Sequence, residues 1–209
     1  MTVPAANGEI NLGSSFSVSV TGAKGFDDIA RELGRTFNEA QKAGFELEGN
    51  WRGAIAFFAT MRPRLDLSVA RANRTVAVMY HADVQSAWEA QSLAGTWTPL
   101  NAKYAAEKIS DGLGSRTLIA TRAALESLGY TFSDDLSISI GVTVTSEGSD
   151  EPYMLVQEFG SNDGSVPARA LFGPILDQNL SRYVRVYEEA VEKALEGGVY
   201  PDFTQGAFA

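Results

Sequence analysis

Two segments of the chain alternate between apolar and polar side chains with a period of two. Residues 14–20 place phenylalanine and valine at every second position with serines between them, and residues 136–144 alternate leucine, isoleucine and valine with small residues. This alternation is typical of a strand with one buried face. A polar turn at residues 146–150 follows the second segment, and residues 153–159 are expected to return as its partner in a β-hairpin.

Elsewhere the apolar residues recur every three or four positions, which is typical of helices that bury one face. The expected helices cover residues 27–43, 50–60, 67–90, 101–109 and 117–128, and a last helix begins near Phe172. Pro63 is expected to interrupt the chain between the second and third helices. Asn101 is a suitable cap for the fourth. The last helix ends at Gly197, and at about 24 residues it is roughly 36 Å long.

This order of elements predicts an α+β fold, in which a small antiparallel sheet with a β-hairpin packs against several helices, one of them a long C-terminal helix. Residues 13–197 are expected to form a single α+β domain. Residues 1–12 are then an N-terminal arm and residues 198–209 an extended C-terminal tail, because neither segment has enough apolar pattern to fold alone.

Composition and charge argue against several kinds of functional site. The 209 residues include no cysteine and one histidine, His81, so neither a thiolate metal site nor a histidine-rich metal site is expected. The net charge of −9 argues against tight binding of nucleic-acid phosphates. Four arginines of one region either face phosphates or form a solvated or subunit-contacting helix face, and nearby acidic residues favour the second reading: Arg62, Arg64, Arg71 and Arg74. No run of about 18 apolar residues and no N-terminal secretion signal is seen, so no membrane association is expected.

One pattern resembles an enzyme. The run Thr21-Gly22-Ala23-Lys24-Gly25, together with the Tyr-x-x-x-Lys spacing of Tyr104 and Lys108, looks like the opening and the proton-transfer pair of short-chain dehydrogenases. A dinucleotide fingerprint needs a further glycine at the start of the helix, but Asp27 and Asp28 stand there and would repel a pyrophosphate. An oxidoreductase of this type is therefore a remote alternative, and no catalytic residue, cofactor or metal is expected.

Four segments between Gly95 and Leu195 occur in an order that resembles a family of tailed-phage proteins. They are Gly95-Thr96-Trp97-Thr98-Pro99-Leu100 with the helix after it, residues 118–128, residues 153–160 ending in Glu158-Phe159-Gly160, and Val166-Pro167-Ala168-Arg169-Ala170-Leu171-Phe172-Gly173-Pro174. In order and spacing they are similar to the tail-completion and virion-morphogenesis proteins that join the filled head to the tail. The family's Thr-Gly pair is Thr121-Arg122 here, and because a glycine would allow a positive φ, the local turn is expected to differ.

The resemblance implies a structural virion protein of the phage neck, assembled in the cytoplasm of the host bacterium and without enzymatic activity. It implies a homo-oligomeric ring, with a hexamer favoured and a dodecamer as the other size. Its partners would be the head connector or adaptor and the tail terminator or tail tube, and DNA would pass through the lumen without specific binding. The alternatives are other virion parts, such as a tail terminator, a connector adaptor or a minor capsid protein.

Large aromatic side chains and one arginine are the candidate contacts with a neighbouring subunit or another partner, because such residues often anchor interfaces. They are Trp97, Tyr153, Phe159, Arg169, Phe172, Tyr200, Phe203 and Phe208. In a free monomer four of these aromatic residues would close the core: Trp97, Tyr153, Phe159 and Phe172. Arg169 has two roles that stay open, either to reach a carboxylate across the subunit boundary or to bond local carbonyl groups.

Overall fold

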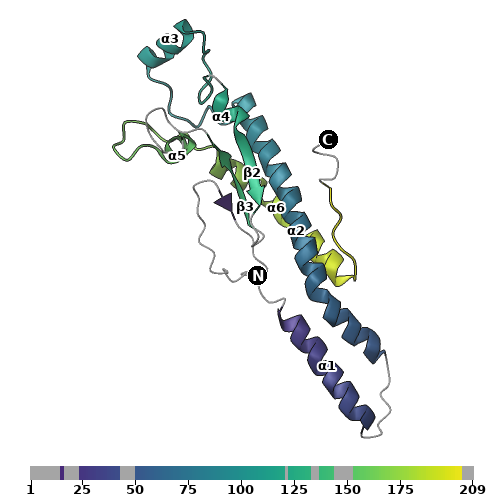
Figure 1. The fold of residues 1–209 in the computed structure, drawn as a ribbon. Coiled ribbons are helices and arrows are strands. Elements are labelled where there is room, and N and C mark those ends of the chain that lie inside the picture. The colour runs from purple at the N-terminus through teal and green to yellow at the C-terminus, as the bar shows by residue number, and fades with distance from the viewer. Residues whose placement is uncertain are drawn as a thin grey trace. The chain divides into compact units, whose positions relative to one another are not determined.

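The computed structural model describes residues 15–16, 24–42, 50–120, 122–132, 137–143 and 153–203. Within these residues the chain forms six helices and a small antiparallel sheet (Figure 1), which confirms the α+β fold and the long C-terminal helix. The described residues gather into two compact units, one of residues 24–42, 50–75 and 183–203 and the other of residues 15–16, 76–120, 122–132, 137–143 and 153–182. A single domain over residues 13–197 stays a prediction.

Helix α2, Trp51–Ala90, runs through Pro63, so the predicted interruption is wrong. A proline inside a helix removes one backbone hydrogen bond and crowds the preceding turn. Side chains supply additional hydrogen bonds here, because the guanidinium of Arg64 donates to Thr60 O at 3.1 Å and to Phe57 O at 2.9 Å. These bonds add contacts between the turns around Pro63, but they do not replace the bond to Ala59 O that a residue with an N–H would make there.

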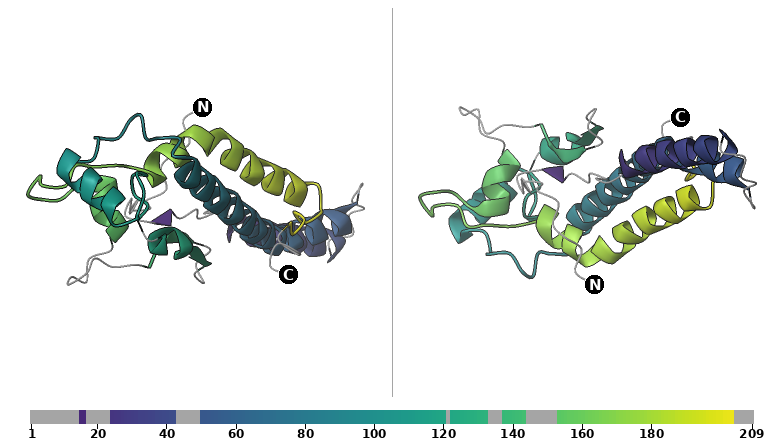
Figure 2. Two further views of the ribbon diagram at one scale, coloured as in Figure 1. Left: turned by 90° about the horizontal axis from the view of Figure 1, so that it is seen from above. Right: turned by 90° about the horizontal axis from the view of Figure 1, so that it is seen from below.

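The first unit contains α1, Lys24–Lys42, and the packed parts of the two longest helices. The N-terminal part of α2 and the C-terminal part of α6, Phe172–Leu195, lie side by side and run antiparallel (Figure 2). Met61 packs against Ala194, and further along α2 the hydroxyl of Tyr187 donates to Asn73 Oδ1 at 2.8 Å. Burial raises the pKa of Tyr187, so its hydroxyl keeps the proton that this bond needs.

Helix α6 ends at Leu195, just before the predicted stop at Gly197, whose φ of +91° favours glycine. The chain then returns to α2 within the first unit. The backbone N–H of Tyr200 donates to Ser68 Oγ at 3.0 Å, and Arg71 donates to Tyr200 O at 2.9 Å. The first residues of the predicted extended tail are therefore bound to a helix of the same chain.

The sheet lies in the second unit and has the order β1-β3-β2, with all neighbours antiparallel. Strand β3, Ile138–Val142, is central between β1, Ser15–Phe16, and β2, Leu128–Phe132. Ile138 and Ile140 are 1% and 2% exposed, so the alternation identified the buried face of this strand correctly.

Residues 153–159 form helix α5, Tyr153–Phe159, so the strand predicted there is wrong. The hairpin is formed instead by β2 and β3, and both edges of β3 are already occupied by strands. Met154 and Gln157 are buried three residues apart, which places them on one face of a helix but on opposite faces of a strand. In an apolar run this short, the sequence does not distinguish the helical period of about 3.6 residues from the strand period of two.

The helix predicted over residues 117–128 is also wrong, since only one turn forms, α4, Ala123–Glu126. Leu118 and Arg122 take φ values of +61° and +67°, which a right-handed helix excludes. At Arg122 the chain thus has the positive φ that a glycine favours, at the position where the resembling family has glycine.

Candidate functional site

Three of the four segments that carry the family resemblance meet at one place in the second unit, which we call the junction. The indole N–H of Trp97 donates to Ala170 O at 2.8 Å, and Nε of Arg169 donates to Thr98 O at 3.0 Å. The backbone N–H of Arg169 donates to Gln157 O at 2.6 Å. Because Trp97 and Arg169 are each 7% exposed, these hydrogen bonds lie in the interior of the unit.

The carboxylate of Glu158 completes the junction by capping the first turn of α6. Its Oε2 accepts from the N–H groups of Leu171 at 2.7 Å and Phe172 at 3.1 Å, and its Oε1 accepts from the N–H of Gly173 at 2.9 Å. These N–H groups have no partner inside the helix, and a negative charge there is favoured by the helix dipole. Sequence reasoning missed this role, because Glu158 precedes Leu171 by 13 positions, outside the window in which caps are sought.

A tight loop connects α5 to the last junction segment. Gly160 takes a φ of +82°, and a Cβ atom there would lie 3.1 Å from Val166 O. The carboxylate of Asp163 accepts hydrogen bonds from Ser161 Oγ at 2.6 Å and from the N–H of Ser165 at 3.0 Å. The bond from Ser161, followed by those from Ser165, lowers the pKa of Asp163 to about 2. Local hydrogen bonds therefore set the path of the loop.

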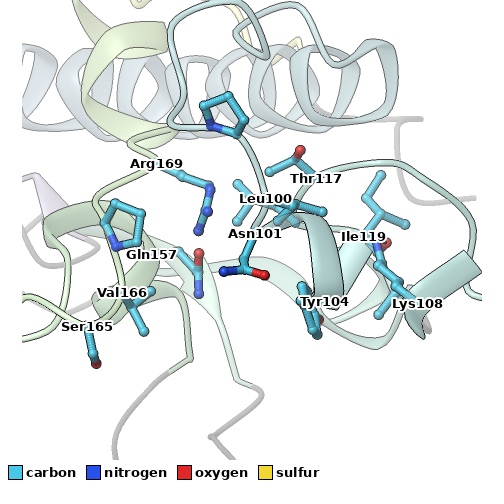
Figure 3. Close-up of a pocket in the computed structure, with 14 residues that line it drawn as sticks. Leu100, Asn101, Tyr104, Lys108, Thr117, Ile119, Gln157, Ser165, Val166 and Arg169 are labelled. Carbon is cyan, nitrogen blue, oxygen red and sulfur yellow. Dashed lines mark hydrogen bonds between the residues drawn. The ribbon is translucent and has the colours of Figure 1, made fainter. Parts of the chain in front are cut away.

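A pocket of about 580 Å³ opens beside the junction (Figure 3). One wall is α3, Ala102–Ser110, which begins as predicted at Asn101, whose side chain accepts from Lys103 N at 2.9 Å. Residues 117–120 and 165–167 form the other walls. The side chains of Arg169, Gln157 and Asn101 point toward one another in Figure 3. The pocket thus combines the junction with a helix and a loop from elsewhere in the chain.

Two of the residues that line the pocket are buried cations. Lys108 is 4% exposed, and its Nζ donates to Arg116 O and, at 2.6 Å, to Ile119 O. Burial lowers the pKa of Lys108. Neither Lys108 nor Arg169 forms an ion pair with any described residue, and no aspartate or glutamate is among the described residues that line the pocket. This is unusual, because buried charges in proteins are normally paired.

The amide side chain of Gln157, which also lines the pocket, has an oxygen without a hydrogen-bond donor among the described residues. Gln157 is 8% exposed, and its side-chain oxygen Oε1 is buried without a hydrogen bond from any described residue. Most buried polar atoms have at least one partner, and an exception calls for an explanation. The pocket therefore presents two cations without a described carboxylate next to a hydrogen-bond acceptor without a described donor.

The predicted interface residues fall into different environments. Three are buried in contacts within the chain: Trp97, Arg169 and Tyr200. Phe172 is half-buried at the start of α6. Two are exposed, by 54% and 63%: Phe159 and Phe203. The side chain of Tyr153 and the whole of Phe208 lie outside the described residues. Of the two roles open to Arg169, the structure shows the bond to a local carbonyl, that of Thr98.

The residues that resemble a dehydrogenase do not form a dinucleotide site in the part of the chain that the structure describes. Strand β1 is an edge strand antiparallel to β3, whereas the dinucleotide fold needs a parallel sheet with the glycine loop after a central strand. Residues 17–23 lie outside the described part. Tyr104, which is 52% exposed, and the buried Lys108 line the same pocket, and Lys108 is held by two backbone carbonyls.

The four arginines of the region around Pro63 all have partners within the chain. Arg62 lies 3.7 Å from Asp66, and Arg74 lies 3.6 Å from Asp202. The other two donate to backbone carbonyls: Arg64 and Arg71. His81 is half-buried, with its Nε2 3.2 Å from Leu128 O.

Within the described ranges, no cluster of three or more histidine, aspartate or glutamate side chains could hold a metal ion. No helix in that part of the chain is both long and apolar enough to span a membrane.

Comparison with protein-family models, with curated proteins and with solved structures gave no match to this chain.

Proposed function

We propose that this chain is a structural subunit of the neck of a tailed-phage virion, where copies of it form a ring that joins the head to the tail. The junction is the observation that supports the proposal. Hydrogen bonds of Trp97 and Arg169 bring together two segments that are 71 to 73 positions apart and whose order resembles tail-completion proteins. The third segment, which a short loop joins to the second, bonds to it through Glu158. Chance matches to short motifs have no reason to gather at one place.

The surface and the charge suit this role. A closed ring needs heterologous contacts, in which one patch of a subunit meets a different patch of the next. The exposed aromatic rings of Phe159 and Phe203 are suited to such contacts. The net charge of −9 would let DNA pass through the lumen without binding to it. The ring is a hexamer in the favoured form and a dodecamer in the other, and it contacts the head connector or adaptor on one side and the tail terminator or tail tube on the other.

Two mass measurements test this proposal. Native mass spectrometry of the purified chain is expected to show a closed oligomer, and mass spectrometry of purified virions is expected to find the chain among their structural proteins. A chain that stays monomeric at all concentrations and is absent from virions would contradict the proposal. A chain found in virions at a place other than the joining ring would instead be a tail terminator, a connector adaptor or a minor capsid protein.

A further inference from the structure

The pocket beside α3 holds more positive charge than the described part of the chain compensates. Lys108 and Arg169 are at least nine-tenths buried, and no carboxylate among the described residues lines the pocket or pairs with either of them. A charge that leaves water is costly unless an opposite charge or several hydrogen bonds replace the solvent. The arrangement is therefore incomplete within the part of the chain that the structure describes, and an anion would complete it.

The remaining donors and acceptors define what kind of anion fits. Arg169 uses Nε for the carbonyl of Thr98, which leaves its other N–H groups without a partner in the described part of the chain. A planar guanidinium matches a carboxylate through two parallel hydrogen bonds. The neighbouring Oε1 of Gln157 needs a donor, which a carboxylate alone does not offer. A ligand that carries a carboxylate and an N–H group close together would satisfy both side chains.

A peptide segment with an aspartate or glutamate has both groups. We propose that the pocket receives an acidic side chain of an extended peptide segment, whose carboxylate pairs with Arg169 near Lys108 while a backbone N–H donates to Gln157. The volume of about 580 Å³ is in the range of pockets that enclose small ligands, so it has room for one side chain and its flanking peptide groups.

A second copy of this chain is the source of the segment, an assignment that rests on the proposed ring. The chain carries 26 acidic residues against 17 basic ones, so its copies offer many carboxylates. Residues 144–152 contain three of them within five positions, at Glu147, Asp150 and Glu151, and no basic residue. This is the segment that we expect to enter the pocket of a neighbour.

Isothermal titration of the full chain with a capped peptide of residues 144–152 tests this proposal. The chain is used at a concentration at which native mass spectrometry finds it monomeric, so that no neighbour occupies the pocket. Replacing the three acids by their amides is expected to weaken binding about tenfold or more. Arg169→Lys is expected to weaken it about tenfold, because the bidentate geometry is lost. Lys103→Gln is the matched control, because Lys103 lies on α3 with Lys108, is 86% exposed and does not line the pocket. The affinity of this variant for the peptide should be unchanged.

Gln157→Leu separates a ligand-binding role from a structural one, and it serves also if Arg169→Lys fails to fold. Removing an unpartnered buried oxygen is expected to raise the melting temperature of the free chain by roughly 2–4 °C. The same change is expected to weaken peptide binding about threefold or more, because the N–H of the ligand loses its acceptor. A lower melting temperature with unchanged affinity would overturn the proposal.

The remaining outcomes are also decisive. No binding of any acidic peptide would overturn the proposal, while a closed ring in native mass spectrometry would leave the proposed function standing. A capped peptide with one glutamate among alanines serves as a second probe. If it binds and the peptide of residues 144–152 does not, the recognition of a carboxylate is supported and another protein supplies the segment.

Discussion

Removing the carboxylate of Glu158 is expected to destabilise the second unit, because it uncaps α6. Three backbone N–H groups, those of Leu171, Phe172 and Gly173, lose their acceptor at distances of 2.7, 3.1 and 2.9 Å. Glu158 is half-buried, so water replaces part of each lost bond, and we take about 1 kcal/mol per bond from the lower end of the usual range. Glu158→Ala should then cost about 3 kcal/mol. Glu158→Gln keeps one acceptor oxygen but loses the charge, and should cost about 1–2 kcal/mol.

The assay is urea unfolding of the full chain, followed by far-ultraviolet circular dichroism. The midpoint should fall in the order wild type, Glu158→Gln, Glu158→Ala, with an unchanged slope. Glu188→Ala, at an exposed position in the middle of the same helix, is the control and should stay within about 0.5 kcal/mol of the wild type. If both Glu158 variants unfold within that same margin, the cap does not stabilise the junction and the reasoning is refuted.

Three further predictions concern the backbone and one carboxylate. Gly160→Ala should lower the free energy of unfolding in urea by about 2 kcal/mol and Gly164→Ala by about 1 kcal/mol. Both glycines have a positive φ, but only Gly160 faces a close carbonyl. Equal losses in the two variants would show that this contact is unimportant. Arg122→Gly should be more stable than Arg122→Ala by about 1 kcal/mol, since only glycine relieves the φ of +67°, and the reverse order would exclude this conformation. The pKa of Asp163 is about 2, below its ordinary 3.8, so its carboxylate stabilises the loop above about pH 4, and this contribution is lost as the pH falls toward 2. A nuclear magnetic resonance titration of that carboxyl group with a midpoint near 3.8 would contradict the hydrogen bonds of the loop.

Elements with strong local signals could be predicted from the sequence. The alternation in β3 identified the buried Ile138 and Ile140, the side chain of Asn101 caps α3, and α6 ends just before Gly197. In each case neighbouring residues alone determine the structure, through the period of the apolar positions, a capping oxygen or a positive φ.

The errors arose where contacts outside the local pattern of apolar residues decide the structure. Helix α2 continues through Pro63 with side-chain hydrogen bonds from Arg64, which no propensity scale contains. The run that begins at Tyr153 forms a helix, because β3 already has a strand on each edge. Tertiary pairing thus overrode local preference at Tyr153, whereas in α2 the added bonds are local to the helix.

The candidate site was predictable only in part. The order of short motifs indicated which segments matter, and Trp97 and Arg169 are indeed hydrogen-bonded to one another's segments. The pocket was not foreseen, because its unsatisfied groups come from separate elements, Lys108 from α3 and Gln157 from α5. Nothing local in the sequence marks these two side chains as neighbours of one cavity.

The most direct test of the central claim is an electron microscopy map of the intact virion. The proposed function predicts a closed ring at the neck, in which density for the 24-residue helix α6 repeats around the tail axis, with six repeats in the favoured form. A neck whose density is fully explained by other proteins, with no copy of this chain in the ring, would contradict it.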